Sequence, residues 1–194
     1  MSRVGWVILA LVVIVGALFA SMTRFGGSGD RPKSPSARPA ASVVDEDAVL
    51  AVPVAGVART GIADSWGDPR GEGGRTHQGT DIMAPGGTAV LAAAPGRVEK
   101  LFTSDLGGLT IYVRSPGKRW IYYYAHLAGY APGLAEGQAV ARGQRIGFVG
   151  DTGDAGAGNT HLHFGLQRMA PGERWWQGQS VNPYPLLAGS TAGR

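Results

Sequence analysis

The sequence predicts an all-β fold, mainly antiparallel, in the form of a sandwich or open barrel, preceded by one N-terminal transmembrane helix. Two observations support the β prediction. The 194 residues include 32 glycines and 12 prolines, about twice the average share, which favours short elements joined by tight turns. Apolar and aromatic runs recur about every ten residues between glycine, proline and aspartate, as in antiparallel sandwiches and barrels.

The predicted transmembrane helix rests on an uninterrupted apolar stretch, Val4–Met22. The stretch contains neither charge nor proline, and as a helix it nearly spans the ~30 Å hydrocarbon core of a bilayer. Because no small-x-small cleavage site follows it, an uncleaved signal anchor over residues 1–24 is preferred to a cleaved secretory signal. Basic residues are more numerous after the stretch than before it, so charge counting alone would leave the following domain in the cytoplasm.

Three further segments follow the anchor. Residues 25–42 consist of glycine, serine, proline and basic residues, and we expect a disordered linker. Residues 43–187 form the β-rich domain, and residues 188–194 a flexible C-terminal tail. The formal charge of +4 arises entirely before residue 43, because basic and acidic side chains balance in the rest of the chain. A neutral domain offers no basic face for phosphates, which excludes nucleic acid as a partner.

The domain is expected to contain six strands and one short helix. In the aromatic run RWIYYYAHL, Trp120, Tyr122 and Tyr124 share one face and the residues between them share the other, which is the alternation of a strand. The predicted strands cover residues 88–93, 97–102, 109–114, 119–125, 144–149 and 161–167, and the helix covers residues 45–51.

The four histidines of the chain all lie in this domain. His161 and His163 form an HxH pair, and alternation on a strand places both imidazoles on one face, about 7 Å apart. His77 and Asp81 form an HxxxD pair, in which Gly79 permits a bend that brings the two side chains together. Each pair alone is a weak indication of a site, and their combination is more informative.

Together with His126, which follows a strand at the rim of the sheet, these residues suggest a metal site. The chain has no cysteine, so a metal must be held by histidine and carboxylate groups. Three such ligands and a position left for water are typical of catalytic zinc, which activates the water and polarises a carbonyl; cobalt or copper could replace zinc in vitro. Two histidines then remain for proton transfer near neutral pH.

Four motifs follow one another along the domain: HQGTDIMAPGGT from His77, YAHL around His126, a glycine-rich run over residues 137–150, and HLHFG from His161. In order and spacing they resemble the lysostaphin/LytM-type zinc metallopeptidases, metallopeptidase family twenty-three, which have a duplicated hybrid motif-like domain. The resemblance implies a two-sheet β fold with a groove between flanking loops. The resemblance implies that His77, Asp81 and His163 bind one zinc ion. It also implies that His126 and His161 are catalytic.

The function implied by the resemblance is that of a zinc metalloendopeptidase, which hydrolyses stem peptides or cross-bridges of bacterial peptidoglycan through a metal-activated water. Such a substrate lies outside the cytoplasmic membrane, so we expect a single-pass inner-membrane protein whose domain faces the periplasm or cell wall, against the charge count. The alternative is a non-catalytic, wall-binding regulator of another cell-wall hydrolase. Relatives of that kind have usually lost site residues, whereas all five are present here.

Asn159, Thr160 and Tyr124 are further candidates for contact with substrate. Asn159 and Thr160 end a glycine-rich segment that lacks the GK[ST] ending of a phosphate loop, and we interpret this segment as a wall of the groove beside His161. A structural role in a turn is an equal alternative for both residues. Tyr124 could line the groove or pack in the core.

Overall fold

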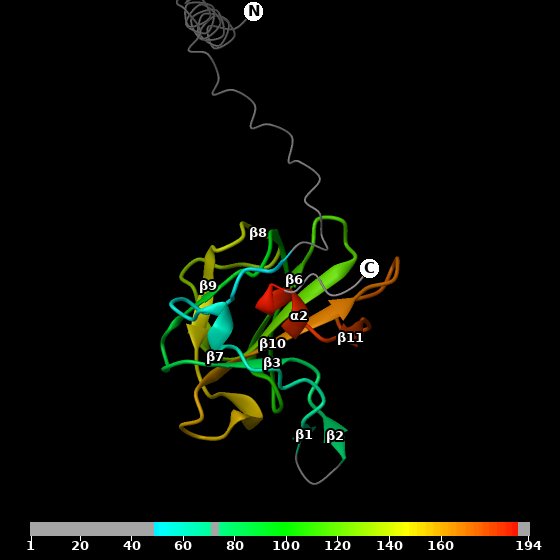
Figure 1. Cartoon of the computed structure of the whole chain (residues 1–194). Helices are drawn as coiled ribbons and strands as arrows, with labels where there is room; N and C mark the ends of the chain where they lie inside the picture. The colour runs from blue at the N-terminus through cyan, green and yellow to red at the C-terminus, as the bar shows by residue number, and fades with distance from the viewer. Residues whose placement is uncertain (1–48, 71–73, 190–194) are drawn as a thin grey trace, which may run out of the picture. The chain divides into compact units, whose positions relative to one another are not determined.

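The structure, a computed structural model, describes residues 49–70 and 74–189, all of which belong to one compact unit (Figure 1). Antiparallel strands dominate the described residues, so the predicted β class is confirmed. The predicted anchor, linker and C-terminal tail lie outside the described residues, apart from Ala188 and Gly189. None of the helices within the described ranges is long and apolar enough to cross a bilayer.

The described residues form eleven strands, two short 3-10 helices and one α-helix. In chain order these are η1 Arg59–Gly61, β1 Pro69–Arg70, β2 Arg75–Thr76, β3 Thr80–Met83, β4 Ala89–Leu91, β5 Gly96–Ser104, β6 Gly108–Arg114, β7 Trp120–Tyr130, β8 Ala139–Val140, β9 Arg145–Val149, η2 Gly153–Ala155, β10 His161–Arg168, β11 Gln179–Val181 and α2 Tyr184–Ala188.

All six predicted strands are present, as β4, β5, β6, β7, β9 and β10. The five strands that were not predicted contain four residues or fewer, which is too short for a recognisable alternation. The helix predicted over residues 45–51 is wrong over residues 49–51, the part that the structure describes. The helix α2 was not predicted, because prolines at its start concealed a pattern of only five residues.

Nine strands form one antiparallel sheet in the order β11-β10-β7-β6-β5-β8, with β3 paired to β10, β9 paired to β7, and β4 paired to β9. The long strand β7 connects the branches, because its first part pairs with β6 and β10 and its last part pairs with β9. Its register shifts between Leu127 and Gly129, and a bulge of this kind bends a strand. The hydrogen bonding therefore joins these nine strands in one branched sheet, whereas the prediction left open a two-sheet sandwich or an open barrel.

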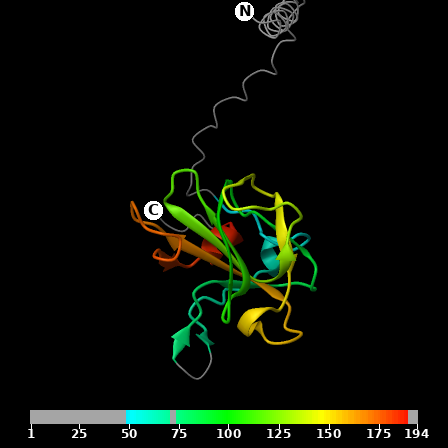
Figure 2. The ribbon, with the colours of Figure 1, turned by 180° about the vertical axis from the view of Figure 1, so that it is seen from behind.

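The apolar core lies on one face of β7 and β10 and leaves the other face open for polar side chains. Tyr122, Tyr124, Leu162 and Phe164 are at most 2% exposed, in agreement with the predicted alternation. The helix α2 packs on the core through the fully buried Leu187, in front of the sheet in Figure 1 and behind it in Figure 2. In both views the β1–β2 hairpin and the segment around η2 project from the same end of the unit.

Candidate metal centre and active site

The strands β10 and β3 place three potential metal ligands side by side. His163 and Asp81 are directly paired in the antiparallel register of these strands, and His77 precedes β3 by three residues. The two residues that alternate with the HxH histidines, Leu162 and Phe164, are fully buried. The imidazoles therefore face the opposite side of the sheet, as predicted from their spacing.

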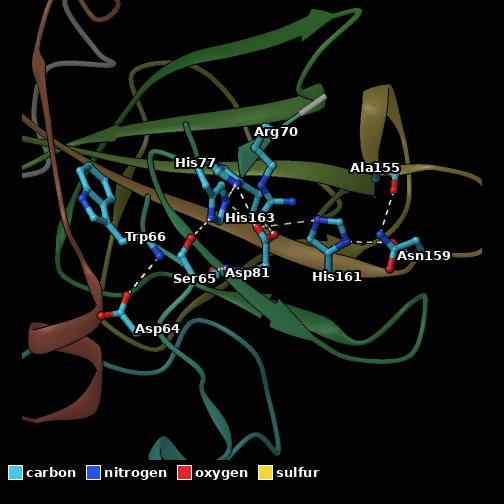
Figure 3. A network of polar contacts seen from close by, with 10 residues as sticks. All are labelled: Asp64, Ser65, Trp66, Arg70, His77, Asp81, Ala155, Asn159, His161 and His163. Atoms are coloured by element: carbon cyan, nitrogen blue, oxygen red, sulfur yellow. Dashed lines mark hydrogen bonds and ion pairs between the residues drawn. The ribbon is translucent and has the colours of Figure 1, made fainter. Parts of the chain in front are cut away.

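The donor atoms of these three residues form a nearly regular triangle (Figure 3). His77 Nε2 lies 2.8 Å from His163 Nδ1, and Asp81 Oδ1 lies 3.0 Å from each of these nitrogens. Ligands bound to tetrahedral zinc at 2.0–2.1 Å would lie about 3.3 Å apart. The triangle therefore fits a divalent metal ion that accepts nitrogen and oxygen ligands, such as zinc.

Ser65 holds two of the three ligands in this arrangement. Its backbone carbonyl accepts a hydrogen bond from His77 Nδ1 over 2.6 Å, so the neutral imidazole presents an unprotonated Nε2 to the metal position. Its hydroxyl accepts a hydrogen bond from the Asp81 backbone N–H over 3.1 Å. Gly79 provides the space that the third ligand needs, since a Cβ at this position would lie 2.6 Å from the His163 ring.

Asp81 is ionised and fixed from two sides. Burial alone would raise its pKa, but the close contacts of the carboxylate with the His163 and His77 imidazoles outweigh the burial and hold the pKa far below its ordinary value. The second carboxylate oxygen, Oδ2, forms an ion pair with the Arg70 guanidinium. Because Arg70 holds Oδ2, only Oδ1 is directed toward the two ligand histidines.

The predicted catalytic histidines lie beside the triangle and are oriented by backbone carbonyls. His126 Nδ1 donates to Thr152 O and His161 Nδ1 donates to Asn159 O, each over 2.8 Å. The Nε2 atom of each neutral ring is then unprotonated, and His161 Nε2 lies 3.8 Å from Asp81 Oδ1. The two rings are adjacent, with centroids 4.9 Å apart.

His126 has a strained backbone and a shifted pKa. Its φ of 60° is in the left-handed region, which non-glycine residues seldom adopt and which often marks functional positions. Burial lowers its pKa, and the hydrogen bond to Thr152 O offsets only part of this effect. The imidazole is therefore neutral at neutral pH and can accept a proton at Nε2.

All five residues line one open cavity of about 970 Å³. Of the three predicted substrate contacts, Asn159 lines this cavity, and its side-chain amide donates to Ala155 O. Thr160 is not among the lining residues, and its hydroxyl donates to Ala84 O.

The proposed substrate contact of Tyr124 is wrong for this conformation. Its side chain is 0% exposed, and its hydroxyl accepts a hydrogen bond from the Ala93 N–H inside the core. The neighbouring Tyr123 lines the cavity instead, because successive residues of a strand point to opposite faces.

Ser65, Arg70 and Thr152 contribute to the site and were missed by the sequence analysis. Ser65 and Thr152 orient His77 and His126 through backbone carbonyls, which every residue type possesses, so their side chains do not indicate these two contacts. Arg70 lies in a glycine-rich segment that resembles an ordinary turn. Its proximity to the HxxxD pair was the only indication available.

Residues 75–183 match the sequence model of Peptidase family M23. This match covers more than half of the chain and includes the three triangle residues, His126 and His161. A relative from Bacillus subtilis (strain 168), an L-Ala–D-Glu endopeptidase, is 40% identical over 129 residues, which are 63% of this chain and 38% of that protein. The peptidoglycan DD-endopeptidase ShyC of Vibrio cholerae is 36% identical over 90 residues, which are 46% of this chain and 20% of that protein.

The alignments thus span less than half of the length of these two curated relatives. Among solved structures, the catalytic domain of the antimicrobial peptidase lysostaphin from Staphylococcus simulans has a TM-score of 0.56 and 28% identity to this chain. The superposition covers 65% of this chain and 90% of that domain.

Proposed function

The chain belongs to peptidase family M23, and on this basis we propose that it is a zinc-dependent metalloendopeptidase that hydrolyses peptide bonds in bacterial peptidoglycan. The observation that carries the proposal is the convergence of the His77, Asp81 and His163 donor atoms in an open cavity, with two further imidazoles beside them. The curated relatives support the substrate, because their names describe an L-Ala–D-Glu endopeptidase and a peptidoglycan DD-endopeptidase.

In this proposal the triangle residues bind one zinc ion through His77 Nε2, Asp81 Oδ1 and His163 Nδ1. When bound, zinc lowers the pKa of a coordinated water and polarises a substrate carbonyl. His126 Nε2 accepts a proton from the attacking water, because burial keeps this imidazole neutral. His161, whose ring lies beside that of His126, orients the substrate oxygen on which negative charge develops and, when protonated, donates to it.

We also propose that residues 1–24 anchor the protein in the cytoplasmic membrane and that residues 25–42 tether the domain, residues 43–187, on the outer side. The location of peptidoglycan supports this orientation, although the basic residues after the apolar stretch would favour the opposite one. The non-catalytic alternative is not favoured, because all five residues that the proposed reaction needs line the same cavity.

Digestion of purified sacculi by the zinc-loaded full-length chain tests the proposed function. We expect soluble fragments with new amino termini, and mass spectrometry of these fragments identifies the bond that is cleaved. His126→Ala should retain zinc and release no fragments, whereas Arg142→Gln, at an exposed position outside the cavity, should act like wild type. A folded, zinc-loaded wild-type chain that leaves sacculi intact would refute the proposal.

A further inference from the structure

Two arginines face each other on the hairpin at the edge of the cavity. Arg70 of β1 and Arg75 of β2 are directly paired in the antiparallel register, an arrangement in which like charges destabilise a sheet. Each guanidinium therefore needs a nearby anion. Arg70 has one in Asp81, which it binds at Oδ2.

The anion beside Arg75 is held much less closely. Arg75 lies 3.6 Å from an Asp154 carboxylate oxygen, which is too far for a good hydrogen bond. The two side chains are 54% and 47% exposed, and exposed ion pairs contribute only about 0–1 kcal/mol. Within the described residues Arg75 has no other polar side-chain partner, so its guanidinium can donate hydrogen bonds to an incoming anion.

This ion pair crosses the cavity that contains the catalytic residues. Arg75 belongs to the hairpin and Asp154 to η2, which project from the same end of the unit (Figures 1 and 2). Both residues line the cavity together with His126 and His161. Asp154 also lies two residues after Thr152, and the backbone carbonyl of Thr152 orients His126.

Besides the histidines, four ionisable side chains among the described cavity-lining residues carry charge at neutral pH: Arg70, Arg75, Asp81 and Asp154. Arg70 and Asp81 neutralise each other at the metal position. Of the two that remain, Arg75 is the cation whose partner can be displaced. The planar guanidinium is also well suited to bind a carboxylate with two parallel hydrogen bonds.

We propose that Arg75 binds a free carboxylate of the peptide substrate and thereby selects acidic peptides. The substrate carboxylate takes the place of Asp154 beside the guanidinium, and Asp154 turns to solvent. This inference rests on the proposed peptidase function and adds the charge of the preferred substrate to it.

The test compares soluble cross-linked muropeptides, released from sacculi by a muramidase, with the same mixture after conversion of its carboxylates to carboxamides. We expect the zinc-loaded full-length wild type to cleave the untreated mixture with a kcat/KM about 10- to 100-fold higher than that for the carboxamide mixture. A difference of this size is the usual effect of a charge-assisted hydrogen bond. The difference should lie mainly in KM, because the contact binds ground state and transition state alike.

Arg75→Gln should cleave both mixtures with the same kcat/KM, equal to the value of wild type on the carboxamide mixture. Arg75→Lys should retain part of the preference for the untreated mixture. Asp154→Asn should keep the preference with a lower KM, and Arg142→Gln should match wild type. Thermal unfolding and zinc content confirm that each variant is folded and loaded.

Equal cleavage of both mixtures by wild type would overturn the role of Arg75 and leave the peptidase function intact. A preference that survives in Arg75→Gln would overturn it as well. Failure of wild type to cleave either mixture would refute the peptidase function itself, and the inference with it.

Discussion

Backbone carbonyls decide which nitrogen each of three histidines presents to the cavity. The carbonyls of Ser65, Thr152 and Asn159 each accept a hydrogen bond from an imidazole Nδ1. Each neutral ring then presents Nε2, with its lone pair, toward the metal position or the substrate. The chemistry therefore depends on the path of the main chain as much as on the histidines themselves.

The pKa of His126 predicts the acidic limb of the pH–activity profile. Burial lowers this pKa below the ordinary histidine value of about 6.5, and proton acceptance requires the neutral ring. Activity should thus be fully present above pH 6.5 and lost as the pH falls through the lowered pKa. The measurement is kcat/KM against pH, with zinc content followed in parallel. A decline that begins above pH 7 without loss of zinc would contradict the assignment.

Arg70→Gln tests whether the guanidinium orients Asp81 for metal binding. The ion pair at Oδ2 directs Oδ1 toward the ligand histidines, and loss of such a supporting contact typically weakens metal affinity about 10- to 100-fold. Competition for zinc between the protein and a chelator measures the change in affinity. Arg142→Gln, which removes the same positive charge at a position outside the cavity, is the control. Unchanged affinity, or an increase caused by relief of repulsion between guanidinium and metal, would show that Arg70 has no orienting role.

At the scale of elements, the site is formed by short strands and loops attached to long strands. The long strands could be predicted, because runs such as that of Tyr122 and Tyr124 alternate over many residues. The strand β3, which carries Asp81, has only four residues, so its pairing with His163 could not be foreseen. Gly79 did indicate the bend, and its close approach to the His163 ring explains why glycine is required there.

One hydroxyl, that of Thr152, contributes two of the hydrogen bonds that hold the segment around η2 against the sheet. Thr152 Oγ1 accepts from the Leu109 N–H and donates to Leu127 O, and the carbonyl of the same residue orients His126. Thr152→Val should leave both backbone groups unpaired, cost about 1–3 kcal/mol of stability, and lower kcat by releasing His126.

Thr110→Val provides the matched control. Thr110 is a fully buried β6 residue whose hydroxyl donates to Phe102 O, outside the cavity lining. This variant should lose comparable stability in thermal unfolding while its kcat stays at the wild-type value. Equal kcat values for the two variants would contradict the role assigned to Thr152.

At the scale of the whole molecule, the five site residues could be predicted because the two weak pairs and His126 together indicated a metal site, and the resemblance of four motifs to a known family implied their roles. The shape of the cavity could not, since it depends on where the β1–β2 hairpin and the η2 segment project. The contrast between Tyr123 and Tyr124 shows this: the alternation was predicted, but not which face of β7 is open.

The proposed membrane anchor makes a prediction for the full chain. The chain should remain with membranes after a carbonate wash, and the double substitution Val12→Asp and Val13→Asp should release it, since an aspartate at a helix centre costs about 2.5–3.5 kcal/mol for insertion. The same change at Val43 and Val44 is the control and should leave the chain membrane-bound. Release of wild type by carbonate would contradict the anchor.

The number of zinc ions bound by the folded full-length chain tests the central claim most directly. Native mass spectrometry after incubation with a small excess of zinc should show one ion per wild-type chain and none in His163→Ala. Circular dichroism establishes that the variant is folded. A folded wild-type chain that binds no zinc, or a His163→Ala chain that binds it equally well, would contradict the proposal that His77, Asp81 and His163 form a single metal centre.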